Sequence, residues 1–246
     1  MSESAKKQTF LHGAALLAMA TAVVKLIGAF YKIPLKGIIG DQGYGYFVTA
    51  YDVYSVLLLV STAGLPVAMS RMISQANALG NHDQVRKVYR TARLIFLGLG
   101  LTSSLFMVLG SRWLAEEVLM QPNAAYAIAC LGPCALFMGL ISTFRGFFQG
   151  QGNMRPTSSS QVLEAAVKLL VGLGLAYVLM KQFNSIPVAA AGAILGVTAS
   201  CAVSSLFLYS KFRPAYRELP QGGQAHSFGT TAKSLLAIAV DRKSVV

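Results

Sequence analysis

Four ionisable side chains fall inside long apolar stretches of the sequence: Lys25, Asp52, Glu164 and Lys168. A charge at the centre of a bilayer costs at least about 2.5–3.5 kcal/mol unless it faces protein or water. Charged residues kept at this depth line paths for ligands, ions or protons. Each of the four is therefore a candidate site residue.

The first apolar stretch concentrates small, polar and basic residues on one helical face. This face comprises Ala14, Ala18, Thr21, Lys25, Gly28 and Lys32. Small residues permit close helix contact or leave room for a cavity, and two cations one above the other suit an anionic ligand. Lys25 could instead extend to the headgroups, but it lies far from both helix ends. The face predicts a water-filled, anion-attracting cavity with Lys25 and Lys32 as binding residues.

Asp52 shares its helical face with Thr49 and Ser55. Three roles stay open for it: neutralising Lys25 or Lys32, binding a coupling cation, or carrying a proton.

A second polar face, in the fifth apolar stretch, contains Gln161, Glu164, Lys168 and Gly172. Glu164 precedes Lys168 by one helical turn, which is the favourable order for an ion pair. The two charges either neutralise each other or take part in binding the transported ligand, and the sequence favours neither interpretation.

Tyrosines cluster where the second apolar stretch begins: Tyr44, Tyr46, Tyr51 and Tyr54. A belt at the membrane interface accounts for most of them, and stacking on a sugar is the alternative.

The composition indicates the elements that hold these residues. Of the 246 residues, 54% are hydrophobic and 12% charged, and the mean hydropathy is +0.56. Soluble domains carry roughly 25% charged residues, so a soluble protein is excluded. Six stretches are long enough to span a bilayer and a seventh is cut short, with predicted bounds 10–34, 44–68, 94–114, 124–148, 160–180, 188–209 and 234–240. The predicted fold is all-α and polytopic, without room for a second, soluble domain.

Positive charge is spread through the short loops rather than gathered on one solvated face. The net charge of +12 therefore reflects membrane topology, and nucleic acid is not an expected partner. Lys and Arg are concentrated in the segment before the first stretch and in alternate loops after it. This asymmetry predicts a plasma-membrane protein with a cytoplasmic N-terminus.

Breaks and surface segments follow from local composition. Residues 77–83 form a turn-like break in a basic loop, and residues 85–93 are predicted to form an amphipathic helix on the membrane surface. Contact with anionic lipids is its expected role, with a regulatory partner as the alternative. Pro66 and Pro133, each near a glycine, predict kinked or interrupted helices.

Catalytic and metal-binding patterns are absent from the sequence. It contains no HExxH, no GxxxxGK[ST], no GxSxG and no close acidic pair in a loop. His12, His82 and His226 are isolated from one another. We therefore expect neither an enzyme, nor a metal site, nor a cofactor.

Several motifs resemble proteins of the multidrug/oligosaccharidyl-lipid/polysaccharide exporter superfamily, in particular those of the stage V sporulation protein B type. The motifs are KQTFLHG at 7–13, VKLIGAFYKIPL at 24–35, GDQGYG at 40–45, STAGLPVA at 61–68, FRGFFQG at 144–150, NMRPT at 153–157 and SQVLE at 160–164. Their order and spacing extend over essentially residues 6–240.

This resemblance implies a flippase that moves polyprenyl-diphosphate-linked saccharides to the outer leaflet by alternating access. Its expected partners are that lipid-linked oligosaccharide, membrane lipids and a second, C-terminal lobe outside this chain. The expected substrate-binding residues are Lys25, Lys32, Asp52, Arg145, Gln161, Glu164 and Lys168. Lipid II flippases carry an arginine at the position of Lys25 and further arginines on the first two helices, whereas the second helix here has no basic residue.

The resemblance also implies a division of the chain. Residues 1–210 form a six-helix lobe, 211–233 a loop between lobes, and 234–240 the start of helix seven. Residues 241–246 are expected to be non-native, because a possible coding of them matches a sequencing-library adapter. One lobe alone is expected to be inactive.

Two other functions remain as alternatives. A cation-coupled exporter of small molecules predicts an acidic cavity, in contrast to the basic first helix. A non-transporting scaffold for envelope or spore assembly predicts that the loop containing residues 86–93, rather than the cavity, carries the function.

Overall fold

The computed structural model describes residues 3–62, 64–220, 223 and 227–240. Within this part every regular element is helical. The elements are α1 (Glu3–Thr62), α2 (Leu65–Ala78), α3 (His82–Leu109), α4 (Ser111–Trp113), α5 (Ala125–Gly150), α6 (Arg155–Phe183), α7 (Ile186–Arg217) and α8 (Phe228–Val240), with a π-helical turn (Leu114–Val118) and a 3-10 turn (Pro122–Ala124) between α4 and α5. The prediction of an all-α protein is confirmed.

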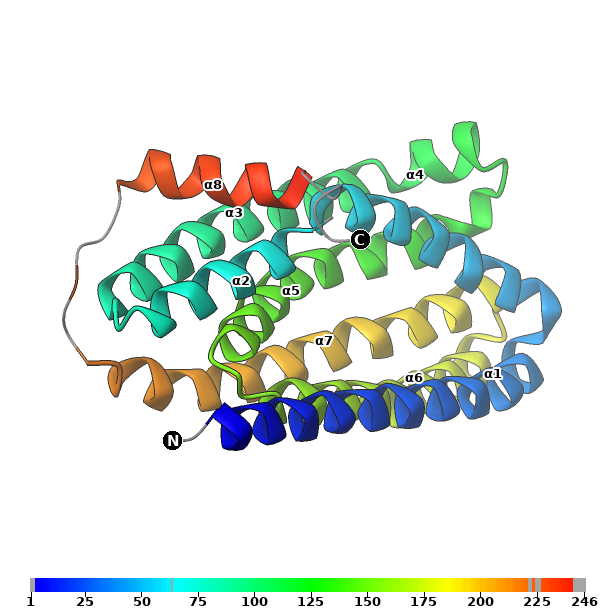
Figure 1. The fold of residues 1–246 in the computed structure, drawn as a ribbon. Helices are drawn as coiled ribbons and strands as arrows, with labels where there is room; N and C mark the ends of the chain where they lie inside the picture. Colours follow the sequence, from blue (N-terminus) through cyan, green and yellow to red (C-terminus); the bar gives the residue numbers. More distant parts are fainter. Residues whose placement is uncertain (1–2, 63, 221–222, 224–226, 241–246) are drawn as a thin grey trace.

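Helix α1 consists of two helices that meet at Gly40. The backbone of Gly40 has φ 69° and ψ 178°, a conformation that a side chain would disfavour. Figure 1 shows α1 running along the molecule, turning, and coming back along its other side. Beside this bend Lys36 forms an ion pair with Asp41 at 2.8 Å. Gly40 therefore separates the first two predicted crossings.

Five helical stretches are long and apolar enough to cross a membrane: His12–Leu59, His82–Leu109, Pro122–Gly150, Arg155–Phe183 and Ile186–Arg217. The first has 48 residues, about twice the ~20 needed for one crossing. Because Gly40 divides it, the five stretches supply the six crossings predicted from the sequence.

The predicted interruptions differ at the two prolines. The second crossing ends at Thr62 rather than near residue 68, and α2 begins after Gly64, which has φ 75°. The interruption predicted near Pro66 is thus confirmed. At Pro133 the helix is not interrupted, because α5 continues through this residue, and a kink there stays a prediction. Pro133 is exposed on the surface of the helix.

The prediction of a surface helix at residues 85–93 is also wrong. These residues form the first turns of α3, and Val85, Val88 and Tyr89 are buried. The ring of Tyr89 stacks on Phe212 of α7 at 4.4 Å between centroids and contacts Phe147 of α5 at 5.7 Å. The apolar face of this segment therefore packs inside the protein instead of on lipid.

The start of α3 binds the chain that follows α7. Arg86 donates hydrogen bonds to the backbone carbonyls of Leu219 and Pro220 and forms an ion pair with Asp83 at 3.2 Å. The helices α7 and α8 end at Arg217 and begin at Phe228, so the connection between them is shorter than the predicted 211–233. Arg86 fixes the start of this connection.

Replacing Arg86 by alanine is expected to speed tryptic cleavage after Arg217 about tenfold, because hydrogen bonds from a charged donor to two carbonyls are lost. Limited proteolysis of the detergent-solubilised protein measures this rate. Arg71→Ala is the control, since Arg71 is exposed on α2. An equal cleavage rate in both variants would contradict the role of Arg86.

Helix α8 lies beside α2 and α3 and runs parallel to the long axis of the bundle (Figure 1). Leu235 and Ala239 are buried in this contact. The assignment of α8 as the start of a seventh crossing stays a prediction. His226 and residues 241–246 lie outside the described residues.

Candidate functional site: a cationic pocket between α1, α5 and α6

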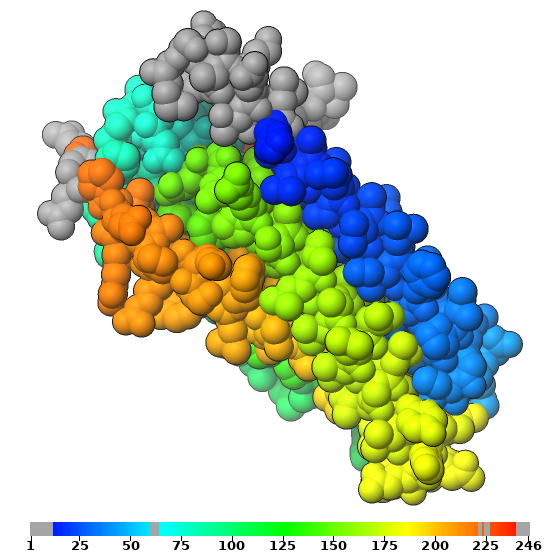
Figure 2. All heavy atoms as spheres, turned by 90° about the horizontal axis from the view of Figure 1, so that it is seen from below, coloured from blue at the N-terminus to red at the C-terminus, as the bar shows by residue number. Residues whose placement is uncertain are grey.

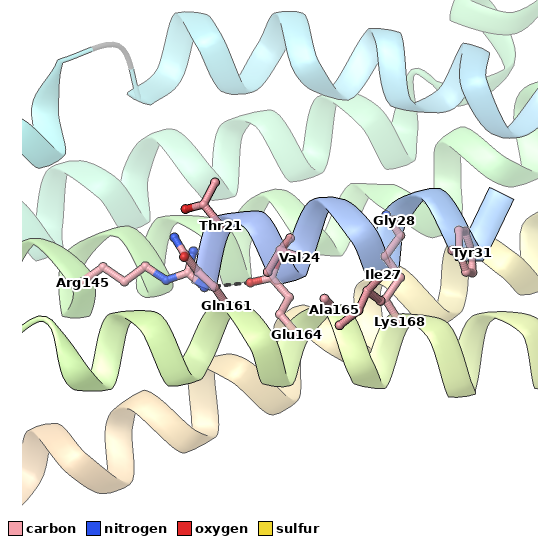
Figure 3. Close-up of a pocket in the computed structure, with 10 residues that line it drawn as sticks. All are labelled: Thr21, Val24, Ile27, Gly28, Tyr31, Arg145, Gln161, Glu164, Ala165 and Lys168. Atoms are coloured by element: carbon pink, nitrogen blue, oxygen red, sulfur yellow. Dashed lines mark hydrogen bonds and ion pairs between the residues drawn. The ribbon is translucent and has the colours of Figure 1, made fainter. Parts of the chain in front are cut away.

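A pocket of about 270 Å³ lies between α1, α5 and α6. Figure 2 shows α1 beside α6 along the face viewed from below, and Figure 3 shows the pocket residues that these helices contribute. The lining residues are Thr21, Val24, Ile27, Gly28 and Tyr31 of α1, Arg145 of α5, and Gln161, Glu164, Ala165 and Lys168 of α6. We call this site the cationic pocket.

Four of the seven predicted site residues meet in the cationic pocket. Gln161, Glu164 and Lys168 recur at helical spacing along α6, so they share the face that meets α1. Arg145 reaches the same space from α5, close to the end of that helix. Lys168 is near the middle of the 29-residue helix α6, deep within a membrane-spanning segment.

Glu164 forms its ion pair with Arg145 rather than with Lys168, which rules against one of the two interpretations left open, the pair that neutralises itself on α6. The Nη2 of Arg145 lies 2.8 Å from the Oε2 of Glu164, as the dashed line in Figure 3 marks. The Nε of Arg145 also donates to Ser160 Oγ at 3.0 Å. Arg145 reaches Glu164 from the last turns of α5, across the short turn at residues 151–154 that joins α5 to α6. The spacing along α6 alone pointed to Lys168 instead.

Lys168 lies between two tyrosine rings. Its ammonium is 5.2 Å from the centroid of Tyr31 and 5.0 Å from that of Tyr51. These tyrosines come from the two halves of α1, on either side of the Gly40 bend, and Phe47 packs between them at 5.9 Å and 4.9 Å. The negative faces of aromatic rings attract a cation, which positions Lys168 without an acidic partner in contact.

The tyrosine cluster is therefore mostly internal, and its prediction as an interfacial belt is wrong for Tyr46 and Tyr54. These two side chains are 8% and 7% exposed. They lie on the face of α1 that turns toward the other helices of the lobe, whereas a belt requires a face that meets lipid.

Two polar atoms of the cationic pocket are buried without a hydrogen-bond partner in the part of the chain that the structure describes. They are the hydroxyl of Tyr31, a residue that is 2% exposed, and Oε1 of Gln161. Buried polar atoms are normally paired, so both are available to water or to a ligand. Tyr31 was not among the site residues predicted from the sequence, although it recurs at helical spacing with Thr21, Val24 and Gly28.

Lys25, Lys32 and Asp52 are exposed and do not line the cationic pocket. The buried face of α1 centres on Val24 and Tyr31, and Lys25 is about 100° away from Val24 around the helix. The face of α1 that lines the pocket is therefore rotated about the helix axis relative to the predicted face. Thr21 and Gly28 belong to both faces, whereas Lys25 and Lys32 lie beside the pocket. Asp52 forms no ion pair with any side chain among the described residues. A binding role for these three residues stays a prediction.

The charges of the cationic pocket favour an anionic ligand. Two basic side chains and one acidic side chain line it, which leaves a formal charge of +1. Within the described residues, no group of three or more His, Cys, Asp or Glu side chains is arranged to hold a metal ion. The arrangement can bind and orient an anion, but it contains no nucleophile paired with a general base.

Comparison with known proteins identifies the family. The family model described as polysaccharide biosynthesis protein matches residues 10–236, which is nearly the whole chain. The chain belongs to this family. Two relatives in Bacillus subtilis (strain 168) are stage V sporulation protein B, 29% identical over 207 residues, and the lipid II flippase MurJ, 29% identical over 190 residues.

Solved structures of membrane transporters have the same fold. An outward-facing multidrug resistance MATE family transporter of the MOP superfamily matches with a TM-score of 0.76 at 18% identity. A MOP superfamily transporter from Pyrococcus furiosus, described as having a binding pocket of reverse polarity, matches with a TM-score of 0.73 at 17% identity. Each match covers 96% of this chain and 51% of the other.

The matches cover most of this chain but only about half, or less, of the proteins it resembles. They include 84% of this chain and 40% of stage V sporulation protein B, and 74% of this chain and 35% of MurJ. The fold matches about half of each of the two solved transporters. The chain itself is a multi-pass membrane protein. Among its relatives, MurJ is a flippase rather than an enzyme.

Proposed function

We propose that this chain forms the N-terminal lobe of a flippase that moves polyprenyl-diphosphate-linked saccharides from the inner to the outer leaflet of the plasma membrane. The N-terminus is cytoplasmic in this proposal, and the two lobes alternate access around a central path. The observation that carries the proposal is the excess of positive charge in a pocket formed by membrane-spanning helices.

Two groups of cations support a diphosphate headgroup as the ligand. Arg145 and Lys168 line the cationic pocket, and Lys25 and Lys32 are on the exposed flank of α1 beside it. A diphosphate that leaves water needs its charge offset, and charge-assisted hydrogen bonds from Arg and Lys supply this. The flanking lysines attract the headgroup, and the pocket cations hold it. In this proposal Asp52 either modulates the positive charge of these lysines or senses an ion.

The second candidate function is cation-coupled export of small molecules. The multidrug resistance MATE transporter with the same fold and the carboxylate of Glu164 favour it. In this chain, however, Glu164 is already neutralised by Arg145, and Lys168 adds a further positive charge to the same pocket. The charge of the pocket therefore supports an anionic ligand more than a cationic one.

Lys25→Ala in the full-length protein is expected to abolish rescue of a strain that lacks its own lipid-linked saccharide flippase, because the headgroup loses an attracting cation. Growth of the complemented strain is the measurement, with membrane expression checked in parallel. Lys181→Ala is the matched control, since Lys181 is exposed in the last turn of α6. Full rescue by the Lys25 variant would defeat the site assignment.

A further inference from the structure

Glu164 is the anion that neutralises Arg145 in the cationic pocket. Its Oε2 accepts from Arg145 Nη2 at 2.8 Å. The two side chains are 26% and 15% exposed, so the pair borders the pocket instead of being sealed in the core. A phosphate entering the pocket would therefore compete with this carboxylate for the same guanidinium.

Arg145 is held in place by more than Glu164. Its Nε donates to Ser160 Oγ at 3.0 Å, and Ser160 Oγ donates in turn to the carbonyl of Thr157 at 2.7 Å. A guanidinium has five N–H donors in a planar fork, and these contacts use two of them. Arg145 therefore remains directed at the pocket when Glu164 leaves it, with donors free for another anion.

Glu164 has an alternative partner within reach. Lys168 follows it by one turn of α6, a spacing at which Glu and Lys side chains meet. Lys168 is held here by the rings of Tyr31 and Tyr51, an interaction that leaves its charge unneutralised by contact with a carboxylate. A rotation of the Glu164 side chain from Arg145 toward Lys168 thus exchanges one cationic partner for another.

We propose that Glu164 is a resident competitor, an internal anion that a phosphate group of the ligand displaces from Arg145. This inference rests on the proposed function, because it assumes an anionic ligand in this pocket. The ligand's phosphate takes two donors of Arg145, and the unpartnered hydroxyl of Tyr31 donates to the same ligand. Glu164 then pairs with Lys168. When Glu164 returns to Arg145 it expels the ligand, which lets a flippase release a multiply charged headgroup that two unopposed cations would retain.

The test is calorimetric titration of the full-length, detergent-solubilised protein with inorganic pyrophosphate. Glu164→Gln keeps the shape of the side chain and removes the competing charge, so pyrophosphate is expected to bind at least about tenfold more tightly. Arg145→Gln and Lys168→Gln are expected to weaken binding by a similar factor. Glu116→Gln is the matched control, because Glu116 is exposed and lies outside the pocket.

The outcomes separate this inference from the function on which it rests. If Glu164→Gln weakens binding as much as Arg145→Gln does, Glu164 positions Arg145 and the inference is overturned while the proposed function stands. If neither Arg145→Gln nor Lys168→Gln alters binding of pyrophosphate, the proposal that this pocket binds an anionic ligand is refuted.

Glu164→Asp covers the case in which the glutamine variant does not fold. It keeps the charge and withdraws it from Arg145 by one methylene, so pyrophosphate is expected to bind more tightly than to the parent, though by a smaller factor than with glutamine. Unchanged or weaker binding by the aspartate variant would overturn the inference.

Discussion

Lys168→Met is expected to slow translocation of a polyprenyl-diphosphate saccharide by the full-length protein about 10–100-fold, the loss that follows when a charged donor to an anion is removed. Lys168 supplies the unneutralised cation of the cationic pocket. Methionine is similar in length, and its sulfur packs well against aromatic rings. The variant should therefore still fill the space between Tyr31 and Tyr51 while lacking the charge.

The measurement is the rate of translocation of a labelled lipid-linked saccharide in proteoliposomes. Lys168→Arg retains the charge and is expected to recover part of the rate, which a purely structural role for Lys168 would not require. Lys181→Met serves as the control on the same helix, because Lys181 is exposed outside the pocket. Parental rates with Lys168→Met would refute the assignment of Lys168 to the ligand path.

Gly196→Val is expected to prevent stable packing of α6 against α7. A Cβ atom at Gly196 would overlap the backbone of Gly172 on α6, and backbone cannot yield as a flexible side chain does. Gly172 has its own constraint, because a Cβ there would lie 2.8 Å from the hydroxyl of Tyr31. Forcing extra atoms into a packed contact costs about 1–3 kcal/mol, and more where backbone must move. The same helix shift would displace Tyr31 from the cationic pocket.

Thermal unfolding of the detergent-solubilised protein measures this effect, with the yield of monodisperse protein as a second readout. Gly174→Val is the matched control on α6, since no atom lies within 4 Å of the position its Cβ would take. Equal stability of the Gly196 and Gly174 variants would show that the α6–α7 contact tolerates a wider separation than the structure has.

Much of the fold could be predicted because membrane insertion depends on local sequence. The length and hydropathy of each stretch indicate a crossing without knowledge of its neighbours, so the six crossings were predicted correctly. The interruption at Gly64 was also predictable, because glycine and proline act on their own backbone. At Pro133, in contrast, α5 continues as a helix, so a proline near a glycine does not by itself specify an interruption.

The rotation of each helix about its axis was harder to predict. Residues 85–93 have the pattern of a helix on the membrane surface, but an apolar face can pack on protein as well as on lipid. Here it packs on Phe147 and Phe212. On α1, the face predicted from its lysines differs by a rotation about the helix axis from the face that packs on α6. In a membrane both lipid and protein are apolar, so hydrophobicity distinguishes these faces poorly.

By itself the sequence determined the all-helical membrane architecture, the number of crossings and the family, together with the charged residues that need a reason to be in the bilayer. Tertiary structure decided which of these charges act together. Arg145 and Glu164 are 19 positions apart, on consecutive helices, and meet where the chain turns back between α5 and α6. Tyr31 and Tyr51 enclose Lys168 only because α1 folds back at Gly40. The physical reason is that desolvation penalises each buried charge independently, whereas neutralisation and ligand binding depend on distances between helices that no local pattern specifies.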